Sequence, residues 1–477
     1  MMSQHPDHNA LVQQLAAIGQ GHLFAFYDQL GSSEKTELDR QIASMDWPLL
    51  AELIRTVVLN PETLKLSENI EPAPFFEHTP HDAATREKYR HAQAIGEQLL
   101  KNNQVAAFVV AGGQGSRLGW DGPKGTFPAT PIKNKPLFQC FAEYLRAMEL
   151  RFGCTIPFYL MTSTANHQAT VDFWMKHNYF GLPESQVMFF SQDMLPAVSL
   201  DGKVLLETPG TLALSPNGHG GSLLALHKSG ALADMQKRGI TQISYFQVDN
   251  PIVRCVDPLF LGLHEMEHAD MSSKILPKVS STEKLGNICL VDGKMTVIEY
   301  SDLPATLAEQ RTADGQLRFR AGSIALHAIR CDFVQRLNAR GFALPYHRAE
   351  KKVSCVDMST GKTIKPEKPN AVKMETFVFD ALPLATGSMV YETDRIDEFA
   401  PIKNAEGVDS IASSRQITTL RNSRWLEAAG VTVPHKPDGS PDCTIEIAPS
   451  FALYPDDIKA KAAKIPPIKP GDGVYLH

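Results

Sequence analysis

Glycines and two cations near residue 115 form the part of the sequence whose residue types point most clearly to chemistry. An apolar run, Val105 to Ala111, ends in Gly112-Gly113-Gln114-Gly115-Ser116-Arg117-Leu118-Gly119. A buried strand therefore gives way to a loop whose backbone N–H groups can approach a ligand with no Cβ atom in the way. Arg117, together with Lys124 of Pro123-Lys124-Gly125, adds positive charge that backbone dipoles alone do not supply. This pattern predicts a loop that binds the phosphates of a nucleoside triphosphate.

Glycines alone do not identify the ligand, because any tight turn from a strand to a helix also needs them. The chain has no Gly-x-x-x-x-Gly-Lys-Ser/Thr sequence. No predicted strand ends in Asp or Glu about 20 residues further on, where a dinucleotide fold would hold a ribose. A P-loop and a dinucleotide site are therefore both disfavoured.

A carboxylate follows a second predicted strand, Ile243–Val248, which ends at Asp249-Asn250-Pro251. Proline biases the residue before it away from helix and ends strand pairing. Ligands of open α/β sheets bind at the carboxyl ends of the strands, so we expect Gly112 and Asp249 at the same edge. Mg2+ needs only one or two protein oxygens beside phosphates and waters, and Asp249 could provide one. The alternative is that Asp249 only caps a turn.

Two further loops contain candidate binding residues. The segment Pro216-Asn217-Gly218-His219-Gly220-Gly221 opens a predicted helix, where backbone groups can contact a flat or anionic ligand. The same glycines could serve only the entry into the helix. Lys403 follows Pro401-Ile402 and precedes Asn404, which predicts a loop. A lysine in a loop is usually just solvated, so this position alone indicates no function.

The composition is that of an ordinary globular chain. The 477 residues are 43% hydrophobic and 21% charged, which is enough for two or three domains. A net charge of -6 gives no electrostatic footprint for nucleic acid or an anionic membrane. The seven cysteines stand singly, without Cys-x-x-Cys, and are expected to be reduced. No signal-like N-terminus and no membrane-length apolar run is present, so we expect a cytoplasmic protein.

Periodicity divides the chain into three consecutive parts. Residues 1–102 are predicted to be an N-terminal helical region, and residues 103–385 alternate strands and helices. This alternation predicts an α/β catalytic domain with a mostly parallel mixed sheet. Residues 386–477, where prolines accumulate, are predicted to form a small C-terminal domain. The predicted strands are Val105–Ala111, Pro157–Met161, Val187–Phe190, Ile243–Val248, Ser273–Leu276, Asn287–Val291 and Thr296–Tyr300, and predicted helices include 82–102, 137–152, 166–177 and 222–238.

The ordered motifs resemble those of the eukaryotic-type UDP-N-acetylhexosamine (UDP-N-acetylglucosamine) pyrophosphorylases, of the UDP-sugar pyrophosphorylase family UDPGP type 1. The resemblance runs from about residue 105 to 435 and is carried by Gly112–Gly119, Pro123–Gly125, Val248–Asn250, Val297–Ser301, Lys365–Asn370, Glu375–Asp380 and Pro401–Ala405. It implies a Rossmann-like nucleotide-diphospho-sugar transferase fold. The implied reaction joins UTP and a hexosamine 1-phosphate to a UDP-sugar, with release of pyrophosphate and with Mg2+ or Mn2+ as cofactor.

The resemblance also implies roles for individual residues. Arg117 and Lys124 face the departing pyrophosphate, and Lys403 contacts the phosphates on the sugar side. The implied nucleotide-binding residues are Gly112, Gly113, Gln114, Gly115, Gln192, Gly218 and His219. The implied sugar-side residues are Asp249, which also binds the metal, Gly286, Glu299, Ser323, Phe377 and Phe379. UTP and the sugar 1-phosphate are the implied partners of a monomer or weak homo-oligomer.

A general base is not required by this chemistry. The second pKa of a sugar phosphate is about 6, so its oxygen is already ionised near pH 7 and can attack the α-phosphorus directly. The protein must align two anions that repel each other and stabilise charge on the bridging oxygen. His219 is therefore interpreted as a binding residue.

Two positions depart from the family pattern. Ser323, in Ala321-Gly322-Ser323, stands where the family commonly has Asn, and so does His219, in His219-Gly220-Gly221. The Gly-His-Gly loop is more similar to that of UDP-glucose and broad UDP-sugar pyrophosphorylases. The sequence therefore leaves N-acetylglucosamine and glucose open as the sugar. A dinucleotide-binding dehydrogenase and a non-catalytic sugar-nucleotide-binding protein are alternatives of another class.

Overall fold

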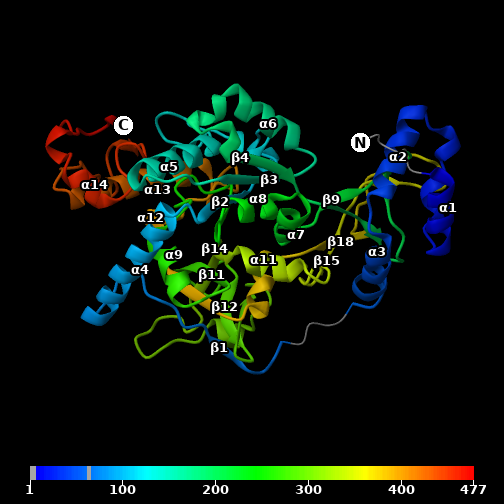
Figure 1. The fold of residues 1–477 in the computed structure, drawn as a ribbon, viewed down its shortest axis with the longest axis horizontal. Coiled ribbons are helices and arrows are strands. Elements are labelled where there is room, and N and C mark those ends of the chain that lie inside the picture. The colour runs from blue at the N-terminus through cyan, green and yellow to red at the C-terminus, as the bar shows by residue number, and fades with distance from the viewer. Residues whose placement is uncertain (1–6, 62–65) are drawn as a thin grey trace. The chain divides into compact units, whose positions relative to one another are not determined.

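The computed structural model describes residues 7–61 and 66–477, which form two compact units, each with its own core (Figure 1). The smaller unit combines the chain up to Leu66 with Gln192–Leu223 and Ala343–Asp380. The larger unit combines Ser67–Ser191, Leu224–Phe342 and Ala381–His477. This interleaved division differs from the three consecutive domains 1–102, 103–385 and 386–477, which stay a prediction.

A ten-stranded mixed sheet forms the centre of the larger unit. Its main path is β1-β12-β14-β10-β2-β3-β4; β11 pairs with β14 and β19, and β13 pairs with β12. Strands β10, β2, β3 and β4 are parallel, whereas β14 is antiparallel to β10 and β11. The bounds are β1 Ile70–Pro72, β2 Val105–Val110, β3 Phe158–Thr162, β4 Val187–Ser191, β10 Gln242–Gln247, β11 Met271–Pro277, β12 Asn287–Val291, β13 Lys294–Ile298, β14 Ala321–Arg330 and β19 Ser388–Glu392. The predicted α/β class with a mostly parallel mixed sheet is confirmed.

Helices cover this sheet, which is why its parallel strands are apolar on both faces. Phe141 of α5 packs on Phe246, with ring centroids 5.2 Å apart, and Trp174 of α6 packs on Phe158 at 5.7 Å. The helices after residue 66 are α4 Ala83–Lys101, α5 Leu137–Phe152, α6 His167–Lys176, α7 Gly221–Lys228, α8 Ala231–Lys237, α9 Pro258–Met266, α10 Ala305–Ala308, α11 Cys331–Asn338, α12 Arg395–Glu398, α13 Ile411–Ala428 and α14 Pro455–Lys459. The prediction of a single helix over 222–238 is wrong. The structure has two helices there, α7 and α8, which are separated at Gly230, whose φ of +83° is left-handed.

Strand β14 was not among the predicted strands, although it pairs with β10, β11 and β12. Its alternation is interrupted by a bulge, because Lys274 pairs with Leu326 while the next residue, Ile275, pairs with Ser323. Ala325, inside the bulge, has a left-handed φ of +55°. Bulges bend a strand and re-aim its side chains, and this one lies beside Ser323.

The C-terminal part of the larger unit is built around α13, the 18-residue helix that hydrophobic periodicity did not predict. Its buried residues are mostly polar and include Ser414, Thr418, Thr419, Asn422 and Ser423. Trp425 and Leu426 of α13 pack with Ile445 and Ile458 in a separate apolar cluster. The parallel pair β20 Thr444–Ile447 and β21 Gly473–Leu476 completes this part.

The smaller unit begins with the helices predicted for residues 9–60, namely α1 His8–Ala17, α2 Ser32–Ala43 and α3 Trp47–Leu53. Their apolar faces pack on short strands from the two later segments, and Leu15, Leu38 and Ile42 share one core with Val198 and Val372. These strands are β5 Met194–Pro196, β6 Val198–Ser199, β7 Leu206–Thr208, β8 Thr211–Leu212, β9 Leu214–Pro216, β15 His347–Lys351, β16 Cys355–Val356, β17 Thr363–Ile364 and β18 Ala371–Glu375.

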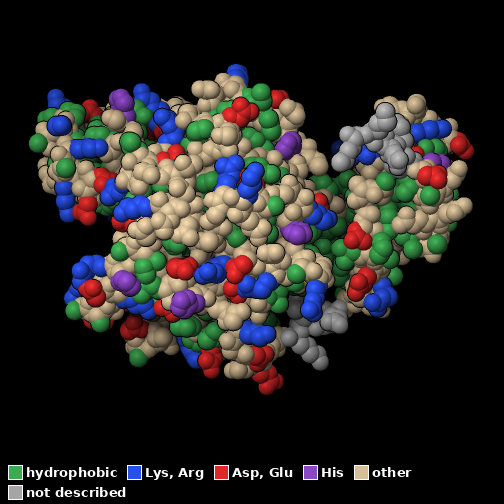
Figure 2. Space-filling model, viewed as in Figure 1, with side chains coloured by type: hydrophobic (Ala, Val, Ile, Leu, Met, Phe, Trp, Pro, Cys, Tyr) green, Lys and Arg blue, Asp and Glu red, His purple; other side chains and the backbone are tan. Residues whose placement is uncertain are grey.

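Charged side chains of both signs lie on the surface (Figure 2), and the cysteines, all of which the structure describes, form no disulfide bonds. On the face drawn in Figure 2, Lys and Arg side chains are interspersed with Asp and Glu side chains. All seven cysteines are free, and five of them are buried. Among the described residues, no helix combines the length and the apolar character that a membrane crossing requires.

Candidate active site

Side chains that follow β3 fix the glycine loop from residue 111 to 119. Asn166 Nδ2 donates hydrogen bonds to the carbonyl oxygens of Ala111, at 2.9 Å, and Gly113, at 3.2 Å. Ser163 Oγ donates to the carbonyl oxygen of Gly112 at 2.9 Å. Asn166 is 1% exposed, so these bonds are protected from water. These bonds therefore hold the start of the loop, residues 111–113, against the chain that follows β3.

The Pro-Lys-Gly element is tied to the same loop. The backbone N–H of Lys124 donates to the carbonyl oxygen of Gly113 at 3.1 Å. A Cβ atom at Gly115 would lie 2.7 Å from the side chain of Trp120, and one at Gly125 would enter the ring of Phe138. Close packing therefore requires glycine at both positions, whereas at Gly113 the added atom would meet open space. The backbone at Gly113 is exposed and therefore accessible to a ligand.

Two ammonium groups lie near the carboxylate of Asp249. Oδ2 of Asp249 is 4.0 Å from Nζ of Lys124 and 3.9 Å from Nζ of Lys403. Burial lowers the pKa of Lys124; Asp249 opposes this effect, and the charges of Lys403 and Arg117 add to it. A second carboxylate, that of Asp409, also acts on Lys124 and on Lys403, so two carboxylates stand beside three cations. The remaining positive charge fits an anionic ligand, and Arg117, Lys124, Asp249 and Lys403 are named the charge cluster.

Asp249 lies at the end of β10, as predicted. Its carbonyl oxygen accepts a hydrogen bond from the N–H of Ile402 at 2.8 Å. The turn at this corner is made by Asn250 instead, whose Oδ1 accepts from the N–H of Ile252 at 3.4 Å. The carboxylate of Asp249 therefore remains oriented to the lysines, and the interpretation of Asp249 as a turn cap is disfavoured.

The donor set at Asp249 is compatible with Mg2+. The described residues contain no group of three or more His, Cys, Asp or Glu side chains placed to hold a metal. A cation here would take one carboxylate oxygen from the protein and the rest of its oxygen ligands from phosphates and water. This is the way in which proteins usually bind Mg2+ together with a nucleotide.

Three residues of the implied sugar side are neighbours in the larger unit. The N–H of Ser323 donates to the carbonyl oxygen of Gly286 at 2.8 Å. A Cβ atom at Gly286 would lie 2.7 Å from Val297 Cγ1 and 3.6 Å from Glu299 Oε1. The close approach of Val297 explains the glycine. Gly286, Glu299 and Ser323 therefore form one local group.

The smaller unit contains a second set of candidate residues around His219. Its Nδ1 accepts a hydrogen bond from the N–H of Val378 at 3.0 Å, and its ring lies 5.3 Å from Phe377 and 5.5 Å from Phe379. Burial and the neighbouring His347 lower the pKa of His219 to about 4. The imidazole is therefore neutral near pH 7, with Nδ1 as acceptor, and could not serve as a general base with a pKa near 7.

The candidate residues divide between the two units. The larger unit contains Gly112, Gly113, Gln114, Gly115, Arg117, Lys124, Asp249, Gly286, Glu299, Ser323 and Lys403. The smaller unit contains Gln192, Gly218, His219, Phe377 and Phe379. Gly218 has a left-handed φ of +66°, and its Cβ would lie 2.4 Å from the carbonyl oxygen of Thr376. Gln192 is 6% exposed, and its side-chain oxygen accepts no hydrogen bond from any described residue.

Comparison with known proteins assigns the chain to a family. Residues 62–469 match the family described as UTP--glucose-1-phosphate uridylyltransferase, UDPGP. The chain belongs to the UDPGP family. It is 35% identical to human UDP-N-acetylhexosamine pyrophosphorylase-like protein 1, covering 91% of each chain. It is 34% identical to the UDP-N-acetylglucosamine pyrophosphorylase of Saccharomyces cerevisiae, covering 87% of this chain and 90% of the yeast protein.

Two solved structures have the same fold as this chain. The putative UDP-N-acetylglucosamine pyrophosphorylase of Entamoeba histolytica is 29% identical and has a TM-score of 0.74, covering 86% of this chain and 99% of that one. The uridine diphosphate N-acetylglucosamine pyrophosphorylase of Trypanosoma brucei has a TM-score of 0.84 at 23% identity, and the match covers 100% of this chain and 99% of that one. The nucleotide-diphospho-sugar transferase fold is therefore confirmed, and a dehydrogenase is not favoured.

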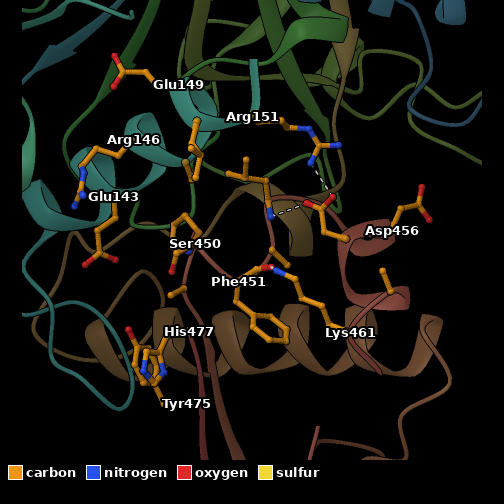
Figure 3. Close-up of a pocket in the computed structure, with 18 of the residues that line it drawn as sticks. Glu143, Arg146, Glu149, Arg151, Ser450, Phe451, Asp456, Lys461, Tyr475 and His477 are labelled. Carbon is orange, nitrogen blue, oxygen red and sulfur yellow. Dashed lines mark hydrogen bonds and ion pairs between the residues drawn. The ribbon is translucent and has the colours of Figure 1, made fainter. Parts of the chain in front are cut away.

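A separate cavity of about 880 Å³ lies between α5 and residues 448–461 of this UDPGP chain (Figure 3). Its charged side chains are satisfied within the protein: Arg151 pairs with Asp457 at 2.7 Å, and Lys461 donates to the carbonyl oxygen of Phe451. No residue of the charge cluster lines it. The cavity is therefore not the candidate active site.

Ser163 and Asn166, which support the glycine loop, were not among the residues predicted from the sequence. A signal was available, because Ser163-Thr164-Ala165-Asn166 follows β3 directly and β3 is the parallel neighbour of β2. Polar residues at the carboxyl ends of neighbouring parallel strands meet at one edge of the sheet. In this chain, Ser163 and Asn166 hold the start of the glycine loop.

The lowered pKa of His219 predicts a pH dependence of stability. The folded-state pKa of about 4 lies below the ordinary value of 6.5, so the linked stability is complete above pH 6.5 and is lost as the pH falls toward 4. At pH 5 the loss is about 2 kcal/mol. His219→Asn should therefore lose less stability than wild type between pH 7 and pH 5 in urea unfolding. Equal losses in the two proteins would contradict the assignment.

Proposed function

We propose that the protein is a uridylyltransferase that makes a UDP-N-acetylhexosamine and pyrophosphate from UTP and the sugar 1-phosphate, with N-acetylglucosamine as the preferred sugar. The single observation that supports it best is the charge cluster beside the glycine loop, in a chain of the UDPGP family. The Nζ atoms of Lys124 and Lys403 both lie within 4.0 Å of Asp249, although the two lysines are far apart in the sequence.

Uridylyl transfer in this proposal is a direct displacement. An oxygen of the sugar phosphate forms a bond to the α-phosphorus of UTP, the bond from that phosphorus to the bridging oxygen breaks, and pyrophosphate leaves. Lys124 and Arg117 bind the departing pyrophosphate, and Lys403 binds the phosphates on the sugar side. Mg2+, or Mn2+ in its place, would be held by Asp249 and would neutralise phosphate charge when bound. The preorganised charges stabilise the transition state without a covalent intermediate on the protein.

The remaining candidate residues bind the two ends of the substrates in this proposal. In the larger unit, Gly112, Gly113, Gln114 and Gly115 are assigned to the nucleotide, and Gly286, Glu299 and Ser323 to the sugar. In the smaller unit, Gln192, Gly218 and His219 are assigned to the nucleotide, and Phe377 and Phe379 to the sugar. A cytoplasmic location and a monomer or weak homo-oligomer remain predictions from the sequence.

The proposal is tested with UTP, Mg2+ and a panel of sugar 1-phosphates, with pyrophosphate release as the readout. N-acetylglucosamine 1-phosphate should give the highest kcat/KM, above N-acetylgalactosamine 1-phosphate and glucose 1-phosphate. A higher kcat/KM for glucose 1-phosphate, or similar values for all sugars, would favour a UDP-glucose or broad UDP-sugar pyrophosphorylase. Turnover with none of them would leave a non-catalytic sugar-nucleotide-binding protein.

Ser323 is predicted to help select the sugar. It lies beside the bulge of β14 and next to Gly286, and its hydroxyl has fewer hydrogen-bonding groups and a shorter reach than the family amide. Ser323→Asn should change the ratio of kcat/KM between N-acetylglucosamine 1-phosphate and glucose 1-phosphate by about tenfold, since one buried polar contact is worth roughly 1 to 3 kcal/mol. The requirement for UTP should not change. An identical ratio in wild type and variant would exclude Ser323 from sugar selection.

A further inference from the structure

A fully buried lysine in the central sheet is not used by the proposed mechanism. Lys274, on β11, is 2% exposed. Its Nζ donates to Oδ2 of Asp257 at 2.7 Å and to the two carboxylate oxygens of Glu398 at 2.6 and 2.7 Å. Glu398 is 0% exposed and also accepts from Oγ1 of Thr393 at 2.5 Å. Lys274 therefore fixes the end of α12 from inside the sheet.

Stability alone is a weak reason for such a cluster. Removing charges from water is unfavourable, and apolar residues of similar volume often stabilise a fold equally well or better. What a buried ion pair does provide is a defined geometry, because its partners tolerate few alternative positions. The element held in this geometry is the segment Glu398–Lys403, which ends in a residue of the charge cluster.

Three hydrogen bonds connect this segment to the end of β10. Asn250 Nδ2 donates to the carbonyl oxygen of Glu398 at 2.6 Å, and Asn250 Oδ1 accepts from the N–H of Ala400 at 3.1 Å. The N–H of Ile402 donates to the carbonyl oxygen of Asp249 at 2.8 Å. Asn250 is 4% exposed, so its two side-chain bonds to this segment are shielded from water. Residues 398, 400 and 402 are thus bonded in succession to positions 249 and 250.

We propose that Asn250 and Lys274 are positioning residues that set the distance between Lys403 and Asp249 for uridylyl transfer. This inference rests on the proposed function. Neither residue belongs to the proposed substrate-binding set; each acts through the segment Glu398–Lys403. Lys274 fixes the start of that segment through Glu398. Asn250, which follows β10, holds the segment next to the end of that strand through its two side-chain hydrogen bonds.

Asn250→Ala tests the proposal, with Asn422→Ala as the matched control. Asn422 is also a buried asparagine, 2% exposed, and its Nδ2 donates to a carbonyl oxygen, that of Ile445, at 3.0 Å. Asn250→Ala should lower kcat by about 10- to 100-fold, the effect of a displacement of about 1 Å between reacting groups. The KM for UTP should stay within about threefold of wild type. Asn422→Ala should lose unfolding stability but keep kcat within about twofold of wild type.

Lys274→Met and the double variant Asn250→Ala/Lys274→Met extend the test. Because both residues act on one segment, the loss of kcat in the double variant should be smaller than the product of the single losses. If Lys274→Met does not fold, the comparison of Asn250→Ala with Asn422→Ala decides alone. Equal losses of kcat in those two variants, or no loss in Asn250→Ala, would overturn the positioning role. The proposed function would still stand in that case, provided that the wild-type protein turns over its substrates. A wild-type protein that releases no pyrophosphate would overturn both.

Discussion

Replacing Lys124 with alanine is expected to lower turnover by about a hundredfold or more, because one preorganised charge contact contributes about 3 to 4 kcal/mol to transition-state stabilisation. The side chain of Lys124 is 16% exposed and its Nζ lies 4.0 Å from Asp249, so water would not replace the lost charge well. Pyrophosphate release at saturating UTP and sugar 1-phosphate measures the effect. Circular dichroism checks that the fold is kept.

Lys135→Ala is the matched control for Lys124→Ala. Lys135 is another lysine with little exposure, with Nζ 2.6 Å from Glu143, but it is not part of the charge cluster. Its replacement should lower unfolding stability and leave turnover close to wild type. Turnover of Lys124→Ala within about threefold of wild type would remove Lys124 from the pyrophosphate site.

Asp249→Asn is expected to impair the use of Mg2+ more than the binding of UTP. The substitution keeps the size of the side chain but removes the charge that would hold the ion. We expect turnover at about 1 mM Mg2+ to fall by tenfold or more and to recover in part at higher concentrations. A Mg2+ titration of turnover, with UTP binding measured in parallel, checks this.

The control for Asp249→Asn is Asp457→Asn, which removes a carboxylate from the ion pair with Arg151 in the same unit. Its Mg2+ titration should match that of wild type. The assignment of Asp249 to the metal fails if Asp249→Asn also has a wild-type titration together with normal turnover.

Local patterns predicted the strands that end at the candidate site. The apolar run before Gly112 and the proline after Asn250 mark where β2 and β10 end, and parallel pairing of these strands places both ends at one edge. Lys124 was recognised by its motif, although the glycine that follows it is explained by the packed ring of Phe138. These features depend on neighbours in sequence, which is why they could be predicted.

The remaining features depend on contacts between distant residues. Helix α13 buries Thr418 and Asn422 instead of an apolar stripe, so its periodicity was hidden. Strand β14 is interrupted by the bulge at Ala325. Asn250 contacts Glu398, 148 residues later, and no local pattern indicates this partner. Likewise, Val198 of β6 pairs with Val372 of β18, which unites separate segments in the smaller unit.

The most direct test of the central claim is a product analysis of the purified protein with UTP, N-acetylglucosamine 1-phosphate and Mg2+. Direct displacement at the charge cluster predicts that UDP-N-acetylglucosamine and pyrophosphate form in equal amounts. UTP without the sugar phosphate should then release no pyrophosphate, even at an enzyme concentration equal to that of UTP. Stoichiometric pyrophosphate release from UTP alone would indicate a covalent uridylyl intermediate, and the absence of a UDP-sugar with every sugar phosphate would contradict uridylyl transfer itself.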